Sequence, residues 1–287
     1  MRIWAISADG AGEPAVLTGH LGKVNAVAWS PDGLRLAGGG LDGTVRVWDA
    51  VEHREIAVRP GPFAVFCVAW SPDGSRLAAG SARPYRQDAL ESGLLRILDA
   101  DTLEEEPPVR CHAHWVEALA FRPQGRYVAT ASLDRTVALH DWPALERTTL
   151  LKGHSGFVFT AAFSPDGRTL ATAGEDGRMR LWDVDGGGPP TVADGTVGEL
   201  RRVVFAPDGR FAVVAANARG AEGNEARVWF WSVAERSWSA APAIRGRYVW
   251  SIAISPDSRL LAAAFADRSV GVWRFEQLLA ARKPVAP

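Results

Sequence analysis

The feature that most constrains the fold is a short motif that recurs about every 40 residues. Three copies read Ser-Pro-Asp-Gly and three are degenerate, and together they occupy residues 30–33, 71–74, 122–125, 164–167, 206–209 and 255–258. The prolines of these motifs are separated by 41, 51, 42, 42 and 49 residues. A period of this length is typical of repeat architectures, in which each unit is one small supersecondary element. We therefore expect six similar units.

Each motif lies between two stretches rich in apolar and β-branched residues. In the first unit these are VNAVAWS and LRLAGG, followed by a third stretch, TVRVWDA, and a more polar fourth. Pro-Asp-Gly favours a tight reversal between antiparallel strands, because Pro fixes φ and Gly accepts a positive φ. Four short strands cannot bury both sheet faces alone, so the units should stack radially. This predicts an all-β fold, a β-propeller of four-stranded antiparallel blades with six clear repeats.

Two units also carry a Gly-His and a Trp-Asp dipeptide at matching positions, residues 19–20 with 48–49 and residues 153–154 with 182–183. They resemble WD repeats, and degenerate copies cover nearly the whole chain. The chain is thus similar to the WD-repeat (WD40-type) β-propeller family. The resemblance implies a propeller that serves as an interaction platform, although fold alone does not fix function.

We expect residues 1–287 to form a single WD-repeat domain. Its repeats are predicted at approximately residues 19–60, 61–110, 111–152, 153–194, 195–244 and 245–280. Residues 1–18 are expected to close the ring, with residues 14–18 as the outer strand of the last blade and residues 2–6 left over. A seven-bladed ring, or a segment of a larger propeller, is the alternative.

In the family pattern a His, an Asp, a Trp and a strand hydroxyl form one hydrogen-bonded network. Two units carry the His, Asp and Trp, as His20, Asp42 and Trp48 and as His154, Asp176 and Trp182; two others carry part of the set, as His112 with Asp134 and as Asp267 with Trp273. Such a set resembles a hydrolase triad, but its repetition favours a structural role because an enzyme needs one site. No catalytic residue is predicted.

Four of the six units depart from the full pattern. His140 replaces the Trp of the third unit, Arg245 replaces the His of the sixth, and Gly61 and Thr196 stand at the His positions of the second and fifth. We expect the second and fifth units to be the least rigid.

Cys111, His112 and His114 lie close together, with His140 nearby in the repeat alignment, which is one possible metal site. The better interpretation is structural, because His112 occupies the repeat position and no Cys-x-x-Cys pair is present. No metal or cofactor is predicted.

The start of the first strand in each unit is rich in aromatic residues. Of twelve aligned positions there, six are aromatic, against 9% of the chain. Aromatic side chains often dominate interfaces, although here they could instead plug the channel. The predicted partner-binding residues are Phe66, Trp115, Glu117, Phe157, Phe159, Arg201, Tyr248 and Trp250.

Two insertions interrupt the turn after the second strand of their units, at residues 81–93 and 217–226. Both are expected on the same face as the aromatic positions. Loops of this length in a compact repeat are more often functional or mobile than connective.

Composition narrows the function classes. The net charge is −1 with no Lys/Arg-rich run, so no nucleic-acid partner is expected. No apolar run reaches membrane-spanning length, and two cysteines suit a reducing compartment, so no membrane partner and a cytoplasmic location are expected. We predict a non-catalytic scaffold, sensor or adaptor that binds a protein or peptide and is monomeric in isolation. Membership of a larger multidomain chain is left open.

Two alternatives remain open. One is a small-ligand binder, lectin-like or with an aromatic cage at the mouth. The other is a propeller hydrolase, which usually gathers carboxylates in the channel. Only Glu117 and Glu199 stand at inner mouth positions.

Overall fold

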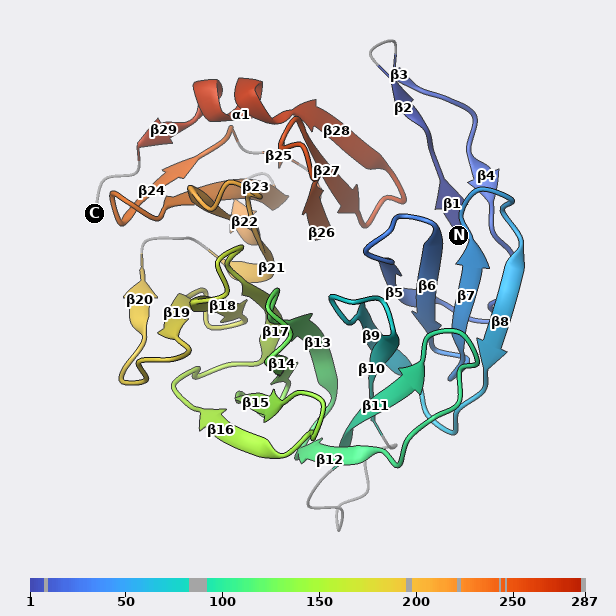
Figure 1. Ribbon diagram of the computed structural model, residues 1–287. Coiled ribbons are helices and arrows are strands. Elements are labelled where there is room, and N and C mark those ends of the chain that lie inside the picture. Colours follow the sequence, from blue (N-terminus) through green and yellow to red (C-terminus); the bar gives the residue numbers. More distant parts are fainter. Residues whose placement is uncertain are drawn as a thin grey trace.

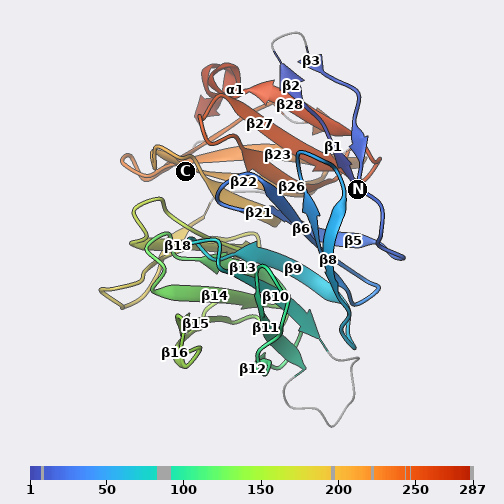
Figure 2. The same ribbon diagram turned by 45° about the vertical axis from the view of Figure 1, so that its right-hand side comes forward.

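A computed structural model describes residues 1–7, 10–82, 92–194, 198–220, 223–242, 244–245 and 247–284. Six antiparallel sheets of three or more strands form a ring (Figure 1), and a second view shows them stacked face to face (Figure 2). This confirms the predicted all-β, six-bladed propeller. The described residues contain no helix that is both long and apolar enough to span a membrane.

The strands of each blade are called a, b, c and d from the centre of the ring outward. Blade 1 contains β5 (Val24–Trp29), β6 (Arg35–Gly40), β7 (Val45–Asp49) and β8 (Glu55–Arg59), and blade 2 contains β9 (Val65–Trp70), β10 (Arg76–Ala82), β11 (Gly93–Asp99) and β12 (Val109–His112). Blade 3 contains β13 (Val116–Phe121), β14 (Tyr127–Ser132), β15 (Val137–Asp141) and β16 (Arg147–Leu151), and blade 4 contains β17 (Val158–Phe163), β18 (Thr169–Gly174), β19 (Met179–Asp183) and β20 (Thr191–Ala193).

Blades 5 and 6 are less regular. Blade 5 contains β21 (Glu199–Phe205), β22 (Phe211–Gly220), β23 (Gly223–Ser232) and β24 (Ser237–Ala240), with β25 (Ile244–Arg245) paired to β23 and β29 (Lys283–Pro284) paired to β24. Blade 6 contains β26 (Val249–Ile254), β27 (Leu260–Phe265) and β28 (Val270–Arg274), and the short helix α1 (Phe275–Ala281) follows it.

The repeated motif forms the turn between strands a and b. Its last residue has a positive φ in all six blades, from 70° to 72° at the five glycines and 58° at Ser258. The motif serine accepts the amide of the residue that begins strand b, as Ser71 Oγ does from Arg76 at 2.9 Å. The period seen in the sequence is therefore the period of this turn.

The core lies between blades rather than within them. Apolar residues of strand c pack against strand a of the next blade, as Val45 and Val47 of β7 do in a cluster with Val65 and Val68 of β9. All four of these side chains are at most 8% exposed. Each blade therefore needs a neighbour on both faces.

The N-terminal segment differs from the expected closing strand. It contains β1 (Arg2–Ile3), β2 (Ile6–Ser7), β3 (Gly10–Ala11) and β4 (Ala15–Val16), and β4 pairs with β1 rather than with β28. The reason is packing, because Leu17, after β4, is buried against Leu36 and Trp48 of blade 1. Blade 6 consequently has three strands in the described part of the chain.

The two insertions have different outcomes. Residues 217–226 were expected as a loop, but they extend β22 and β23 into one long hairpin, with pairs from Asn217↔Ala226 to Gly220↔Gly223. Residues 83–91 of the other insertion lie outside the described residues, so its prediction is not tested.

Candidate partner-binding site at the mouth of the propeller

A β-bulge recurs at one position of strand a in every blade. Each register shift leaves one strand-a residue without a ladder partner, and these residues are Asn25, Phe66, Glu117, Phe159, Arg201 and Trp250. A bulge re-aims the side chain that it carries. The side chains of Arg201 and Trp250, from neighbouring blades, meet in this way at the mouth, with the guanidinium 5.1 Å from the indole centroid.

The aromatic residues around the mouth form a chain of ring contacts. Phe66 and Trp115 are stacked, with centroids 4.5 Å apart and planes 15° apart. The contacts continue through His114 to Phe157, and Phe157 meets Phe159 edge-on at 6.4 Å. A band of rings therefore crosses blades 2, 3 and 4.

Cations continue this band across blades 5 and 6. The Arg201 guanidinium lies 4.0 Å from the Phe159 ring centroid, and the Lys23 ammonium lies 5.2 Å from that of Trp250. Tyr248 packs on Trp250 at 4.9 Å and donates its hydroxyl proton to Glu199 at 3.0 Å. The mouth thus presents alternating aromatic and cationic groups.

Glu117 is the one carboxylate among the six bulge residues. Burial raises its pKa, while the positive charges of Arg201 and Lys23 act in the opposite direction. These three side chains come from blades 3, 5 and 1, so the field of the mouth is shared across the ring. Two rings remain open to a partner, since Phe157 is 39% and Trp250 45% exposed.

The structure brings all eight predicted partner-binding residues to the starts of strands a. Sequence reasoning did not include Lys23 and His114 in this set. Lys23 holds one of the twelve aligned positions, which was the available signal; His114 was weighed only as a metal ligand.

The polar network is complete in blade 4. Trp182 Nε1 donates to Thr172 Oγ1 at 2.9 Å, Thr172 Oγ1 lies 2.9 Å from His154 Nε2, and His154 Nδ1 lies 3.0 Å from Asp176 Oδ2. The His154 and Asp176 side chains are 2% and 3% exposed. Burial alone would raise the Asp176 pKa, but hydrogen bonds and charge from His154 hold that pKa well below its usual range.

Blade 3 keeps the network with His140 at the Trp position. His112 Nδ1 lies 2.9 Å from Asp134 and its Nε2 lies 2.8 Å from Thr130 Oγ1. Burial opposes ionisation of Asp134, yet the contacts with His112 and Thr136 lower its pKa to about 2. Burial, together with the charge of His112, lowers the pKa of His140 to about 4.

Blade 1 lacks the strand-b hydroxyl. His20 Nδ1 bonds Asp42 at 3.0 Å, but Gly38 stands where blade 4 has Thr172, and Trp48 donates to the Thr18 carbonyl instead, at 3.0 Å. In blade 6, Asp267 bonds Ser269 and lies 3.5 Å from Arg247, while Trp273 meets Phe265 edge-on.

Arginines on strand c compensate in part, a feature that sequence reasoning missed. In blade 2 the Arg96 guanidinium lies against Gly61, where the pattern has a histidine, and forms two 2.8 Å bonds to Glu105. In blade 4 Arg180 donates to Asp176 at 2.8 Å. The recurring Arg in VRVWD, LRILD and MRLWD was the signal.

The cysteine and histidines that were weighed as a metal site have separate roles. Cys111 is buried with its Sγ 3.7 Å from the Gly93 carbonyl, His112 belongs to the blade 3 network, and His114 packs among the mouth rings. Within the described residues, no group of three or more His, Cys, Asp or Glu side chains is placed to hold a metal ion.

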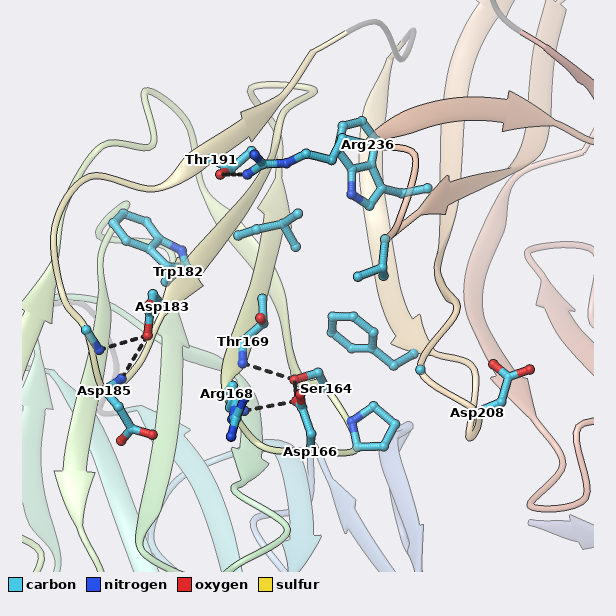
Figure 3. A pocket seen from close by; sticks show the side chains of 17 residues that line it. Ser164, Asp166, Arg168, Thr169, Trp182, Asp183, Asp185, Thr191, Asp208 and Arg236 are labelled. Atoms are coloured by element: carbon cyan, nitrogen blue, oxygen red, sulfur yellow. Dashed lines mark hydrogen bonds between the residues drawn. The ribbon is translucent and has the colours of Figure 1, made fainter.

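A groove of about 820 Å³ lies at the opposite, turn-bearing face between blades 4 and 5 (Figure 3). Its polar groups are largely engaged in turns, as Ser164 with Thr169 and Asp183 with Asp185. Arg236 of blade 5 bridges to Thr191 of blade 4 at 2.8 Å. Trp182, Phe205 and Trp231 also line the groove, which is therefore a second surface with polar and aromatic groups.

We predict that Asp176→Ala destabilises the protein far more than Asp208→Ala. The first change leaves His154 and Arg180 without their carboxylate, and a buried polar group without a partner costs about 1–3 kcal/mol. Within the described part of the chain, Asp208 bonds only the neighbouring Arg210 in an exposed turn. Chemical denaturation measures both, and equal free energies of unfolding would refute the structural role of the network.

We also predict that His140 makes stability depend on pH between about 6.5 and 4. Because its folded pKa is depressed, the unfolded chain binds the proton more readily, and stability falls as pH falls. The slope from one such group is at most about 1.4 kcal/mol per pH unit. His140→Phe should remove this component, whereas the exposed His53→Phe should keep it. Parallel pH profiles for wild type and His140→Phe would contradict the prediction.

Comparison with known proteins agrees with this architecture. The WD domain, G-beta repeat family matches residues 13–49, 54–83, 106–141, 145–183 and 243–274, more than half of the chain. The unmatched stretch contains most of blade 5, the unit with the extended hairpin.

Curated relatives match over about one repeat. Ribosome biogenesis protein erb1 of Emericella nidulans is 50% identical over 42 residues, which are 15% of this chain and 5% of that protein. Small ribosomal subunit protein RACK1y of Oryza sativa subsp. japonica is 61% identical over 36 residues, 12% of this chain and 11% of that protein. These short matches share the repeat, and the family match covers more than half of the chain: the chain belongs to the WD domain, G-beta repeat family.

Proposed function

We propose that this propeller is a non-catalytic scaffold that binds a protein or peptide partner at its mouth. The observation that carries the proposal is the band of aromatic and cationic side chains described above, fixed at the strand-a bulges of a rigid ring. Binding residues are commonly built on the rim of such a scaffold. Large rings and arginines are also the side chains that most often dominate interfaces.

The chemistry of the mouth favours a particular kind of peptide. Lys23 and Arg201 add positive charge, and Phe157 and Trp250 offer exposed ring surface. A segment with an acidic side chain next to an apolar one would complement both. Burial of Glu117 disfavours its charged form, which reduces repulsion of such a segment.

A small-molecule aromatic cage is the weaker alternative. A cage needs ring faces free to receive a cation. Here Arg201 already lies over both Phe159 and Trp250, so a cationic ligand would have to displace a cation of the chain itself. A hydrolase is disfavoured by the repetition of the buried His–Asp network in three blades.

The biological setting is part of the proposal. The matched relatives are named for ribosome biogenesis and the small ribosomal subunit, which suggests a partner within a larger assembly. The matched segments span only 5% and 11% of those two proteins. A cytoplasmic location, a monomeric state, and the absence of nucleic-acid and membrane partners belong to the same proposal.

We predict that Trp250→Ala and Phe159→Ala each weaken partner binding by at least about 1–2 kcal/mol while the protein stays folded. The wild-type chain is used as bait to recover and identify a partner, and affinity is then measured by calorimetry for each variant.

Asp32→Lys on the turn-bearing face is the matched control, expected to change affinity by no more than a few tenths of a kcal/mol. Thermal unfolding of each variant shows that the fold survives. Loss of the partner in Asp32→Lys but not in the mouth variants would place the binding surface at the turns or in the groove between blades 4 and 5.

A further inference from the structure

The N-terminal strands β1 and β4 repeat the outer half of a blade. In blade 4, strands c and d pair Met179↔Ala193, Arg180↔Val192 and Leu181↔Thr191. The N-terminal pair has the same register, with Arg2↔Val16 and Ile3↔Ala15, and Met1 and Leu17 exchange both backbone hydrogen bonds at 2.8 and 2.9 Å. The sequence MRIWAIS aligns with MRLWDV in the same way. β1 and β4 are thus strands c and d of a further blade.

Strands a and b of that blade are missing from the described residues. Because Met1 forms the hydrogen-bonded pair with Leu17, the next residue, Arg2, directs its N–H and C=O away from β4. In blade 4 the equivalent Arg180 faces Thr172 of strand b. No strand of the described chain occupies that place beside β1.

The exposure of Trp4 is consistent with the absence of a strand b beside β1 in the described chain. Trp4 aligns with Trp48 and Trp182, which are buried within complete blades at 1% and 5% exposure. Trp4 is 37% exposed. Its ring therefore lacks the strand-b cover that the other two have.

The face of blade 1 toward this half-blade is open. Val27 and Trp29 of β5 are 53% and 51% exposed. The equivalent Val68 and Trp70 of β9 are 8% and 7% exposed, because blade 1 covers them. β5 therefore presents apolar side chains on a face that no blade of the described chain covers.

The face of blade 6 on the other side is open as well. Val270 and Val272 of β28 are 50% and 39% exposed. The equivalent Val45 and Val47 of β7 are 0% and 1% exposed, because blade 2 covers them. Figure 1 shows β1 and β4 between β28 and β7, so the open faces border one seam.

We propose that this seam, formed by Val27, Trp29, Val270, Val272 and the free edge of β1, binds a β-hairpin of WD-repeat type from a partner polypeptide. The hairpin supplies strands a and b, pairs its strand b with β1, and packs its two faces against blades 1 and 6. The chain itself shows what covers such faces, because five blade-to-blade interfaces pack strand a of one blade on the preceding blade. Strand addition to a free edge is an established mode of peptide recognition.

The occupant has a defined chemistry. It must alternate apolar residues on both sheet faces, with a tight turn between the strands. This interaction is separate from the mouth, so either proposal can fail without the other.

The probe is a synthetic peptide with the sequence of residues 156–175, the strand a–b pair of blade 4, added to the full chain. We expect saturable binding and slowed hydrogen exchange at the Arg2 amide. Val272→Asp should weaken binding at least tenfold, whereas Val192→Asp should not. Val192 is the matched control, since it is 40% exposed on strand d of blade 4, against 39% for Val272.

A second experiment gives a result even if the synthetic peptide self-associates instead of binding the chain. The same hairpin is fused before Met1 through residues 176–178, so that strands a to d are continuous. The fusion should raise the melting temperature, and Val272→Asp should remove most of that gain.

Three results would overturn the proposal. They are no gain in melting temperature on fusion, equal binding by the Val272→Asp and Val192→Asp variants, and a wild-type dimer that Val272→Asp dissociates. The last result would assign the seam to a second copy of the chain.

Discussion

Burial of strand-c side chains against strand a of the next blade is the interaction on which the rest of the structure depends. Val45 and Val47 show it fully, at 0% and 1% exposure, and Val270 and Val272 show what happens without a neighbour. At roughly 25 cal/mol per Å² of apolar surface, this burial is the main favourable contribution to folding of a sheet that has two apolar faces. It also fixes the ring, and with it the positions of the mouth residues.

The polar networks add specificity to this packing and tolerate replacement. Blade 4 has the full Trp–Thr–His–Asp relay, blade 3 substitutes a neutral histidine, and blade 2 places Arg96 and Glu105 at the same corner. What persists in these three blades is a buried histidine or arginine that keeps at least one hydrogen-bonded side-chain partner. The repeats can therefore diverge in these residues while blades 1 to 4 keep the same order of four strands.

Much of the fold could be predicted from the sequence because its determinants are local. The Pro-Asp-Gly turns set the period, and alignment on their prolines placed Phe66, Glu117 and Trp250 at the bulge position. Other features depend on contacts between units. Pairing of β4 with β1 follows from Leu17 packing on Trp48. The contact of the Arg201 guanidinium with two rings depends on the position of its side chain between neighbouring blades. The first had a partial signal in the likeness of MRIWAIS to the strand-c sequence MRLWDV, whereas the second leaves no pattern within one repeat.

The central claim is that the working surface is the mouth, where strands a begin. Hydrogen exchange of the full chain with and without its recovered partner tests this most directly, because it surveys the mouth and the turn-bearing face in one measurement. The account predicts slowed exchange at residues 157–159, 199–201 and 248–250, with the turns at 30–33 and 164–167 unchanged. Protection confined to those turns, or to the groove lined by Asp183 and Arg236, would contradict it.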